Sequence, residues 1–280
     1  MLRSFFLYLA SANWARNLIM RIGLARRTAE RFIAGETLAE ALEVVRQLNA
    51  KGMVGTVDHL GENTTSANDS IRASDEVIEI LEAIERNKLR ANVSVKLSQI
   101  GLVIDENLCR ENLRRILERA REQQNFIRID MEDSSLTEKT VGAYLWARQQ
   151  GFDNTGIVIQ SYLYRSRKDI NEMAEFDTRV RLCKGAYKEP PSAAFPKKAQ
   201  VDANYDDLTR LLIEESRKLG FPKISADGRR PPIPGIATHD AQRIEFAKRL
   251  AAEFKMPNEA LEFQMLYGIR RDLQERLVQQ

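Results

Sequence analysis

The sequence predicts an α/β fold in which parallel β-strands alternate with α-helices. Seven short segments rich in β-branched and other apolar residues recur along the chain, and amphipathic segments of helical length separate them. Repeated strand–helix units of this kind place their strands in a parallel sheet. The chain has 280 residues, of which 43% are hydrophobic, and this is enough for one large core or two ordinary ones.

Each predicted strand lies in a short apolar segment that ends at polar or turn-forming residues. The seven segments are GMVGTVDHLGE from residue 52, ANVSVKLSQIG from 91, NFIRIDMEDS from 125, GIVIQSYL from 156, TRVRLCKGAY from 178, IPGIATHD from 233 and LEFQMLYG from 261. Between them, apolar residues return at helical spacing over 74–87, 106–123, 137–150, 205–219 and 241–254.

Residues 1–50 are predicted to form a helical arm that precedes the strands. The apolar positions that suit a helix hairpin are Leu7, Trp14, Leu18, Ile19, Ile22 and Leu24. No stretch approaches the roughly 20 apolar residues that span a bilayer. The apolar start is also compatible with contact at a membrane surface, but packing against the rest of the fold is favoured.

Two parallel architectures fit the repeat, an open doubly wound sheet and a closed barrel of eight strand–helix units. The open sheet usually carries a glycine-rich phosphate turn after its first strand, whereas DHLGENTT contains no G-x-G-x-x-G and no Walker sequence occurs anywhere. The number of repeats and the length of the chain therefore favour a (βα)8 TIM-type barrel.

Composition argues against several classes of function. The formal net charge is +3 and the basic residues are interspersed with acidic ones, which is typical of solvated helix faces and not of a nucleic-acid-binding stripe. Two cysteines without paired spacing indicate a reducing, cytosolic environment and neither a zinc nor a redox motif. The two histidines, His59 and His239, have no short ligand spacing, so no metal site is predicted.

Polar residues stand at the exit of almost every predicted strand. They are Asp58 with His59, Lys96 with Ser98, Asp130 with Glu132, Gln160, Lys184, Thr238 with His239 and Asp240, and Gln264. Each alone has an ordinary interpretation as a turn or cap residue, as for Asp133 or Ser134 before the next helix. In a barrel, however, all seven exits converge on the face where active sites are built.

Lys96 and Lys184 each follow apolar strand residues, so both ammonium groups are expected at the barrel mouth. A cation there suits an anionic substrate group, a cofactor phosphate, or a carbonyl with which a lysine forms a Schiff base. The last option leaves a Schiff-base aldolase as an alternative function. A barrel that binds a ligand or flavin without turnover is a second alternative.

Six ordered motifs give the chain a resemblance to a known family. The segments SVKLSQIGL, RIDMEDS, GIVIQSYLYRS, RLCKGAYKEP, GIATHD and EFQMLYGIRRDLQ together resemble the monofunctional bacterial proline dehydrogenases. The resemblance implies an FAD-dependent barrel that oxidises L-proline to 1-pyrroline-5-carboxylate, the first step of proline catabolism. It further implies a membrane quinone as electron acceptor and a cytoplasmic protein with peripheral contact at the inner face of the cell membrane. The oligomeric state is left open.

The same resemblance implies a role for individual residues. Lys96 would contact the proline carboxylate, Asp130 would complete the catalytic pocket, and Arg181 would lie near the reactive edge of the flavin. Tyr187 and Leu266 would form walls around the proline ring. The residues that would contact FAD or lie close to it are Met131, Gln160, Lys184, Gly185, Ala186, Thr238, His239 and Gln264.

The sequence departs from the family pattern at its end. After LEFQMLYGIRRDLQERLVQQ the chain stops where the repeat requires an eighth strand and a final helix. In the family, that segment carries an adjacent arginine pair that clamps the substrate carboxylate, and Arg270 and Arg271 lie in an earlier motif. We therefore expect a helical arm over 1–50 and, over 51–280, seven of the eight barrel units with an incomplete substrate clamp.

Overall fold

A computed structural model of the chain describes residues 33–59 and 64–280. The described residues fall into two compact units, one made of those up to Val44 with Met265–Gln280 and the other of Val45–Gln264. The helix hairpin predicted for residues 7–24 lies outside the described residues, and the predicted division at residue 50 stays a prediction.

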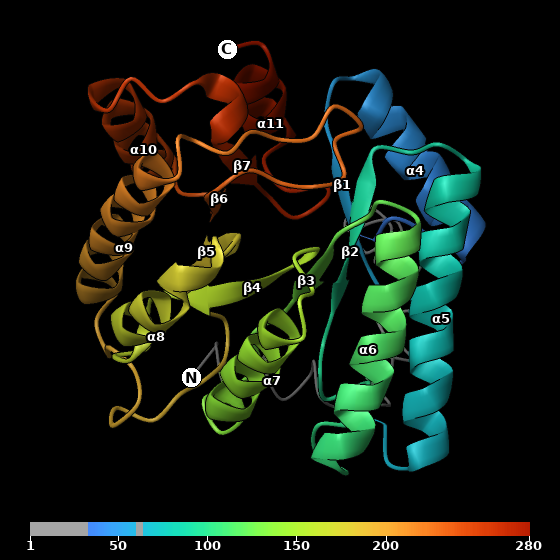
Figure 1. The fold of residues 1–280 in the computed structure, drawn as a ribbon. Coiled ribbons are helices and arrows are strands. Elements are labelled where there is room, and N and C mark those ends of the chain that lie inside the picture. Colours follow the sequence, from blue (N-terminus) through green and yellow to red (C-terminus); the bar gives the residue numbers. More distant parts are fainter. Residues whose placement is uncertain (1–32, 60–63) are drawn as a thin grey trace, which may run out of the picture. The chain divides into compact units, whose positions relative to one another are not determined.

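The larger unit is built on a parallel sheet of seven strands, as the sequence predicts. Strands that are consecutive in the chain are also neighbours in the sheet, and all six pairings are parallel. The strands are β1 (Gly55–Asp58), β2 (Ala91–Val95), β3 (Ile127–Ile129), β4 (Thr155–Gln160), β5 (Val180–Cys183), β6 (Gly235–Ala237) and β7 (Glu262–Gln264) (Figure 1). Each of the seven predicted segments overlaps one of them.

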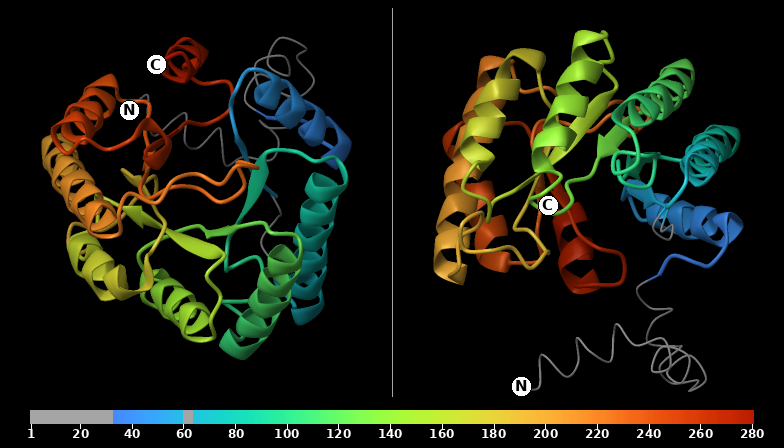
Figure 2. Two further views of the ribbon diagram at one scale, coloured as in Figure 1. Left: turned by 45° about the horizontal axis from the view of Figure 1, so that its top comes forward. Right: turned by 90° about the horizontal axis from the view of Figure 1, so that it is seen from below.

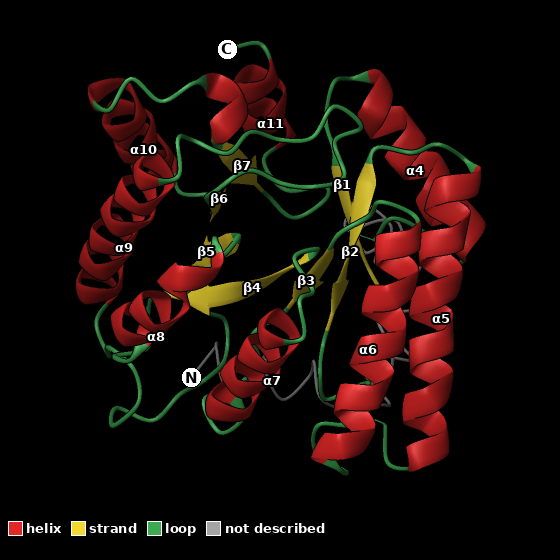
Figure 3. Ribbon diagram, in the orientation of Figure 1, coloured by secondary structure: helices red, strands yellow, loops and turns green. Residues whose placement is uncertain are grey.

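Helices follow the strands and lie on the outer side of the curved sheet (Figures 2 and 3). In the larger unit they are α5 (Ala67–Arg86), α6 (Glu106–Glu122), α7 (Thr137–Gln149), α8 (Ser166–Met173), α9 (Lys198–Lys218) and α10 (Ala241–Glu253). The five predicted helices are confirmed, whereas α8 was not predicted. This alternation is the α/β barrel architecture, with seven strands in the part of the chain that the structure describes.

Four further elements complete the described chain. Helix α4 (Leu38–Ala50) crosses the boundary between the two units, and α11 (Arg271–Val278) belongs to the smaller one. Two short 3-10 helices, η1 (Ala174–Phe176) and η2 (Asn258–Ala260), precede β5 and β7.

Side-chain caps fix several of the helix starts. Ser66 accepts a hydrogen bond from the third residue of α5, Asp105 from the third residue of α6, and Asp240 from the second residue of α10. Helix α7 begins differently, because its N-cap is Leu136 and makes no side-chain cap. The interpretation of Asp133 or Ser134 as the cap of this helix is therefore wrong, and Ser134 is used elsewhere.

A charged residue is buried between the apolar residues of β3. In β3, Ile127 and Ile129 are fully buried, and Arg128 between them is only 1% exposed. Arg128 donates to the carbonyl of Arg179, and burial lowers its pKa to about 9. The facing residue on β4 is Gly156, where a Cβ would clash with Arg128. Barrel interiors usually hold Val, Ile and Leu, and a buried arginine in β3 departs from that pattern.

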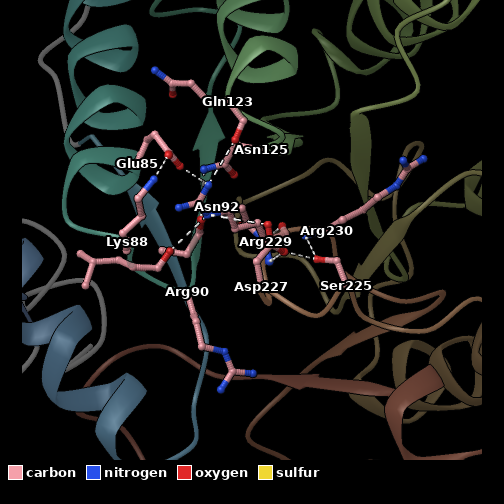
Figure 4. A network of polar contacts seen from close by, with 12 residues as sticks. Glu85, Lys88, Arg90, Asn92, Gln123, Asn125, Ser225, Asp227, Arg229 and Arg230 are labelled. Carbon is pink, nitrogen blue, oxygen red and sulfur yellow. Dashed lines mark hydrogen bonds and ion pairs between the residues drawn. The ribbon is translucent and has the colours of Figure 1, made fainter.

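Arg229 ties the loop between α9 and β6 to the amino-terminal ends of the strands (Figure 4). Its guanidinium contacts Glu85 at 2.5 Å and donates to the carbonyls of Leu89 and Gln123. Asn92 in β2 donates to the carbonyl of Arg229 at 3.0 Å. These contacts join residues more than 100 positions apart. They place a buried cation at the face opposite the strand exits.

We predict that Arg229→Ala lowers the free energy of unfolding by about 2–4 kcal/mol, because it removes charge-assisted hydrogen bonds and buried packing. The neighbouring Arg230 pairs with Asp153 through exposed side chains, so Arg230→Ala should cost at most about 1 kcal/mol. Urea denaturation of both variants measures the difference. Equal losses would show that Arg229 is not a special anchor.

Candidate active site

Four charged residues form one chain of contacts at the strand exits. Asp58 ends β1, Lys96 follows β2, Asp130 follows β3, and Arg181 lies in β5. Lys96 Nζ lies 2.5 Å from Asp58 Oδ2 and 3.6 Å from Asp130 Oδ2. Arg181 Nη1 lies 3.1 Å from Asp130 Oδ1 and also donates to Ser94 Oγ at 3.1 Å. Two cations and two carboxylates thus alternate across four strands.

The environment keeps Lys96 charged. Burial alone would lower its pKa, but the carboxylates of Asp58 and Asp130 outweigh burial, and the net pKa is raised. Burial raises the pKa of Asp58, and Lys96 opposes that rise. The pair is therefore held together by mutual neutralisation in a partly buried site, where an unpaired charge would be costly.

A second charged cluster surrounds Lys184. Its Nζ lies 2.5 Å from Asp202 Oδ1 and 2.6 Å from Asp240 Oδ2. Lys198 also contacts Asp202, and Arg243 contacts Asp202 and Asp206. Burial would raise the pKa values of Asp202 and Asp240, but hydrogen bonds from Lys184 outweigh it and both are lowered. Three cations meet three carboxylates, so Lys184 presents little net charge.

The segment after Lys184 is shaped by a glycine. Gly185 has φ +107°, which L side chains rarely adopt, and a Cβ there would clash with the ring of Tyr162. Ala186 and Tyr187 follow in an exposed loop, Tyr187 with 42% of its surface accessible. Partial burial, followed by the nearby charge of Glu132, raises the pKa of Tyr187, so its phenol is neutral.

Four other predicted site residues form two pairs, one at the exits of β3 and β4 and one at the exits of β6 and β7. Gln160 ends β4 and donates to the carbonyl of Met131 at 3.1 Å. Thr238 donates its backbone N–H to the carbonyl of Gln264 at 3.1 Å, and Thr238 Oγ1 accepts from the amide of Asp240. Gln264 itself donates to Glu262 at 2.8 Å. These contacts fix residues from four strand exits.

The remaining two predicted site residues are placed differently. His239 is half-buried just before the Asp240 cap of α10. Leu266 belongs to the smaller unit and is therefore described apart from the residues above. The structure thus brings twelve of the thirteen predicted residues into one unit, and their individual roles stay predictions.

The comparison with known proteins decides the family. A family model described as proline dehydrogenase matches residues 41–280. The chain belongs to the proline dehydrogenase family. It is 36% identical to proline dehydrogenase 1 of Bacillus subtilis subsp. natto, over its whole length and 87% of the relative. It is 38% identical to the proline dehydrogenase of Deinococcus radiodurans, with 89% of this chain and 77% of that one covered.

A solved structure supports the same fold. Proline utilization A (PutA) from Bdellovibrio bacteriovorus, inactivated by N-propargylglycine, superposes with a TM-score of 0.80 and 26% identity. The match covers 91% of this chain and 30% of that larger one. These findings make the chain a monofunctional bacterial proline dehydrogenase by family, an oxidoreductase that oxidises proline in proline catabolism.

Sequence reasoning missed several residues of the candidate site. Tyr162 and Glu189 hold the loop after β5, and Asp202 binds Lys184 from the second turn of α9. Asp202 stands four residues after Lys198, a helical ion-pair spacing that could have drawn attention to it. Nothing in the local sequence distinguishes Tyr162 from its neighbour Tyr164.

Two kinds of feature are absent from the part of the chain that the structure describes. Over residues 33–59 and 64–280, no helix is long and apolar enough to cross a membrane. Within the same ranges, no group of three His, Cys, Asp or Glu side chains is arranged to hold a metal ion.

We predict that Lys96→Met makes stability more dependent on pH. Without the cation, the pKa of Asp58 should rise further, because Lys96 no longer opposes the effect of burial. An acid whose folded pKa is raised contributes stability while it is protonated and loses it as pH rises through that pKa. In urea denaturation, the free energy of unfolding of the variant minus that of wild type should therefore be higher at pH 5 than at pH 8. A difference that does not vary with pH would contradict this.

Proposed function

We propose that the chain catalyses FAD-dependent oxidation of L-proline to 1-pyrroline-5-carboxylate and passes the electrons to a membrane quinone. The observation that carries the proposal is the contact chain of Lys96, Asp130 and Arg181 at the strand exits. It combines a cation for a carboxylate, an acid beside it and a second cation in one partly buried site. Together with family membership, this arrangement suits a small amino acid better than a neutral substrate.

Each member of the contact chain has a proposed role toward proline. Lys96 is kept as an ammonium by its neighbours and would bind the proline carboxylate. Asp130 would face the amine, which must be neutral for oxidation at the adjacent carbon. Arg181 would supply a fixed positive charge where negative charge develops. Tyr187 and Leu266 are proposed as walls for the proline ring.

The residues proposed to hold the cofactor fit that task. In the described residues, the buried atoms Gln160 Oε1 and Arg181 Nε have no hydrogen-bond partner, and such atoms usually find one. Gly185 supplies the φ of +107° that the backbone adopts beside these residues, and the Tyr162 ring fills the side where a Cβ would lie. The proposed FAD contacts are Met131, Gln160, Lys184, Gly185, Ala186, Thr238, His239 and Gln264. When bound, FAD would accept the hydride removed from proline.

Lys184 needs a specific comment within this proposal. Its ammonium is neutralised by Asp202 and Asp240. It would bind a cofactor phosphate beside these carboxylates with the third N–H of its ammonium. The quinone acceptor and a peripheral position at the inner face of the cell membrane are proposed from the family resemblance alone.

The first test is the visible spectrum of the purified chain, followed by L-proline without oxygen. We expect the visible absorption band that makes a flavoprotein yellow. This band should bleach when proline is added. A yellow protein that does not bleach would keep the cofactor and refute turnover by this chain. A colourless protein that also binds no added FAD would refute the cofactor.

The Schiff-base aldolase alternative is disfavoured by the ion pairs of Lys96. A Schiff-base lysine must lose its proton, whereas the raised pKa of Lys96 favours the ammonium form.

We predict that borohydride added with aldehyde or ketone substrates traps no adduct at Lys96 or Lys184. Mass spectrometry of the digested protein measures this, with glycolaldehyde-treated surface lysines as the positive control. A substrate-dependent adduct at either lysine would favour the aldolase.

The substrate role of Lys96 has a kinetic test. Lys96→Met should raise the KM for proline by roughly 10–100-fold, the range expected when a hydrogen bond to a charged group is lost. Lys139, which pairs with Glu106 on exposed helix surfaces, provides the control Lys139→Met, with an unchanged KM. A normal KM in Lys96→Met would assign the carboxylate to another residue.

A further inference from the structure

The loop after β5 is wound around one side chain, Tyr162. The backbone N–H of Tyr162 donates to the carbonyl of Lys184 at 3.0 Å, and its carbonyl accepts from Phe195 at 2.8 Å. Its ring lies against Gly185, where no Cβ would fit. Its hydroxyl donates to Glu189 Oε1 at 3.2 Å. Tyr162 is 8% exposed, so the loop packs around a buried side chain.

Glu189 extends this arrangement to a third strand exit. Its Oε1 accepts from the backbone N–H of Ser134 at 2.8 Å, and its other oxygen accepts from the Ser134 hydroxyl. Ser134 lies in the loop after β3, Tyr162 follows β4, and Glu189 follows β5. One carboxylate therefore connects three loops at the barrel mouth.

The same contact occurs a second time on the rim. Glu132 accepts from the backbone N–H of Ser98 at 3.0 Å and from the Ser98 hydroxyl. This pair joins the exits of β2 and β3, as Glu189 and Ser134 join those of β3 and β5. Together the two clamps link the exits that carry Lys96, Asp130 and the loop after Lys184. A carboxylate that receives both donors of one serine fixes that backbone position in two directions.

Tyr187 has few packing contacts of its own with which to hold its position. It is 42% exposed and stands between Gly185, which lies on the Tyr162 ring, and Glu189, which binds the Tyr162 hydroxyl. The backbone amide of Tyr187 also interacts with that hydroxyl. Burial and then the Glu189 carboxylate raise the pKa of Tyr162, so the hydroxyl keeps the proton it donates.

We propose that Tyr162 and Glu189 are positioning residues that hold the segment 184–187 in place for the reaction. The inference rests on the proposed function, in which Tyr187 faces proline and residues 184–186 face the cofactor. Neither Tyr162 nor Glu189 touches substrate. They act by limiting the freedom of the loop, so that Tyr187 is already in position when proline binds and little binding energy is spent on ordering it.

The test compares variants that remove single polar groups. Tyr162→Phe removes the hydroxyl but keeps the ring under Gly185, and Glu189→Gln removes the charge. The matched control is Tyr164→Phe, which removes a hydroxyl that donates to Pro191, beyond the segment, at 3.0 Å. Hydrogen exchange of peptides that cover 184–189 is measured without substrate, and proline kinetics and melting temperatures are measured on the same samples.

We expect faster exchange over 184–189 in Tyr162→Phe and Glu189→Gln, and wild-type exchange in Tyr164→Phe. The KM for proline should rise about tenfold in Tyr162→Phe and in Glu189→Gln, which is the equivalent of losing one charge-assisted hydrogen bond. In both variants kcat should change by less than about threefold. The melting temperature should change by less than about 3 °C. The effect of the double variant should fall short of the sum of the two single effects, because both changes act on the contact between Tyr162 and Glu189.

Three results would overturn the inference. They are unchanged exchange over 184–189, equal KM effects in Tyr162→Phe and Tyr164→Phe, and additive effects in the double variant. If wild type itself does not oxidise proline, the proposed function fails, and hydrogen exchange alone then decides whether Tyr162 and Glu189 hold the segment.

Discussion

Mutual neutralisation of charge inside a parallel barrel is the constraint on which the site depends. Asp58, Lys96, Asp130 and Arg181 come from four strands, and their contacts of 2.5–3.6 Å exist only in the observed register. A shift of one residue in any strand would turn its charged side chain toward the helices. The charges therefore favour one register as well as one chemistry, since each would be costly to bury without its partner.

The two ends of the barrel divide stability and function between them. At the amino-terminal ends of the strands, Arg229 binds carbonyls and Glu85. These contacts join elements that lie far apart in the sequence. At the exits, contacts between loops are made by carboxylates with serine and tyrosine donors. Such contacts hold backbone positions without filling the space between them. The side chains that the loops present are then available for the proposed function.

Much of this could be predicted from sequence because it follows from local pattern. Seven strands and five helices have clear periodicity, and Lys96, Asp130 and Arg181 belong to recognisable motifs. Helix α8 was missed because SRKDINEM is short and polar. Arg128 reads as a surface residue in an alternating strand, yet it is buried opposite Gly156. Tyr162 and Glu189 were missed because their contacts join loops, whose geometry periodicity does not report.

The cluster around Lys184 shows how a correct prediction of position can be incomplete in its chemistry. The sequence places this lysine at the exit of β5, where a free ammonium would attract any anion. In the fold, Asp202 and Asp240 occupy it from α9 and from the start of α10. An incoming phosphate would therefore share the ammonium with two carboxylates that are already in contact. Because these carboxylates offset the charge of the lysine, a small anion gains little there, and a ligand that also contacts 184–187 or Thr238 is favoured.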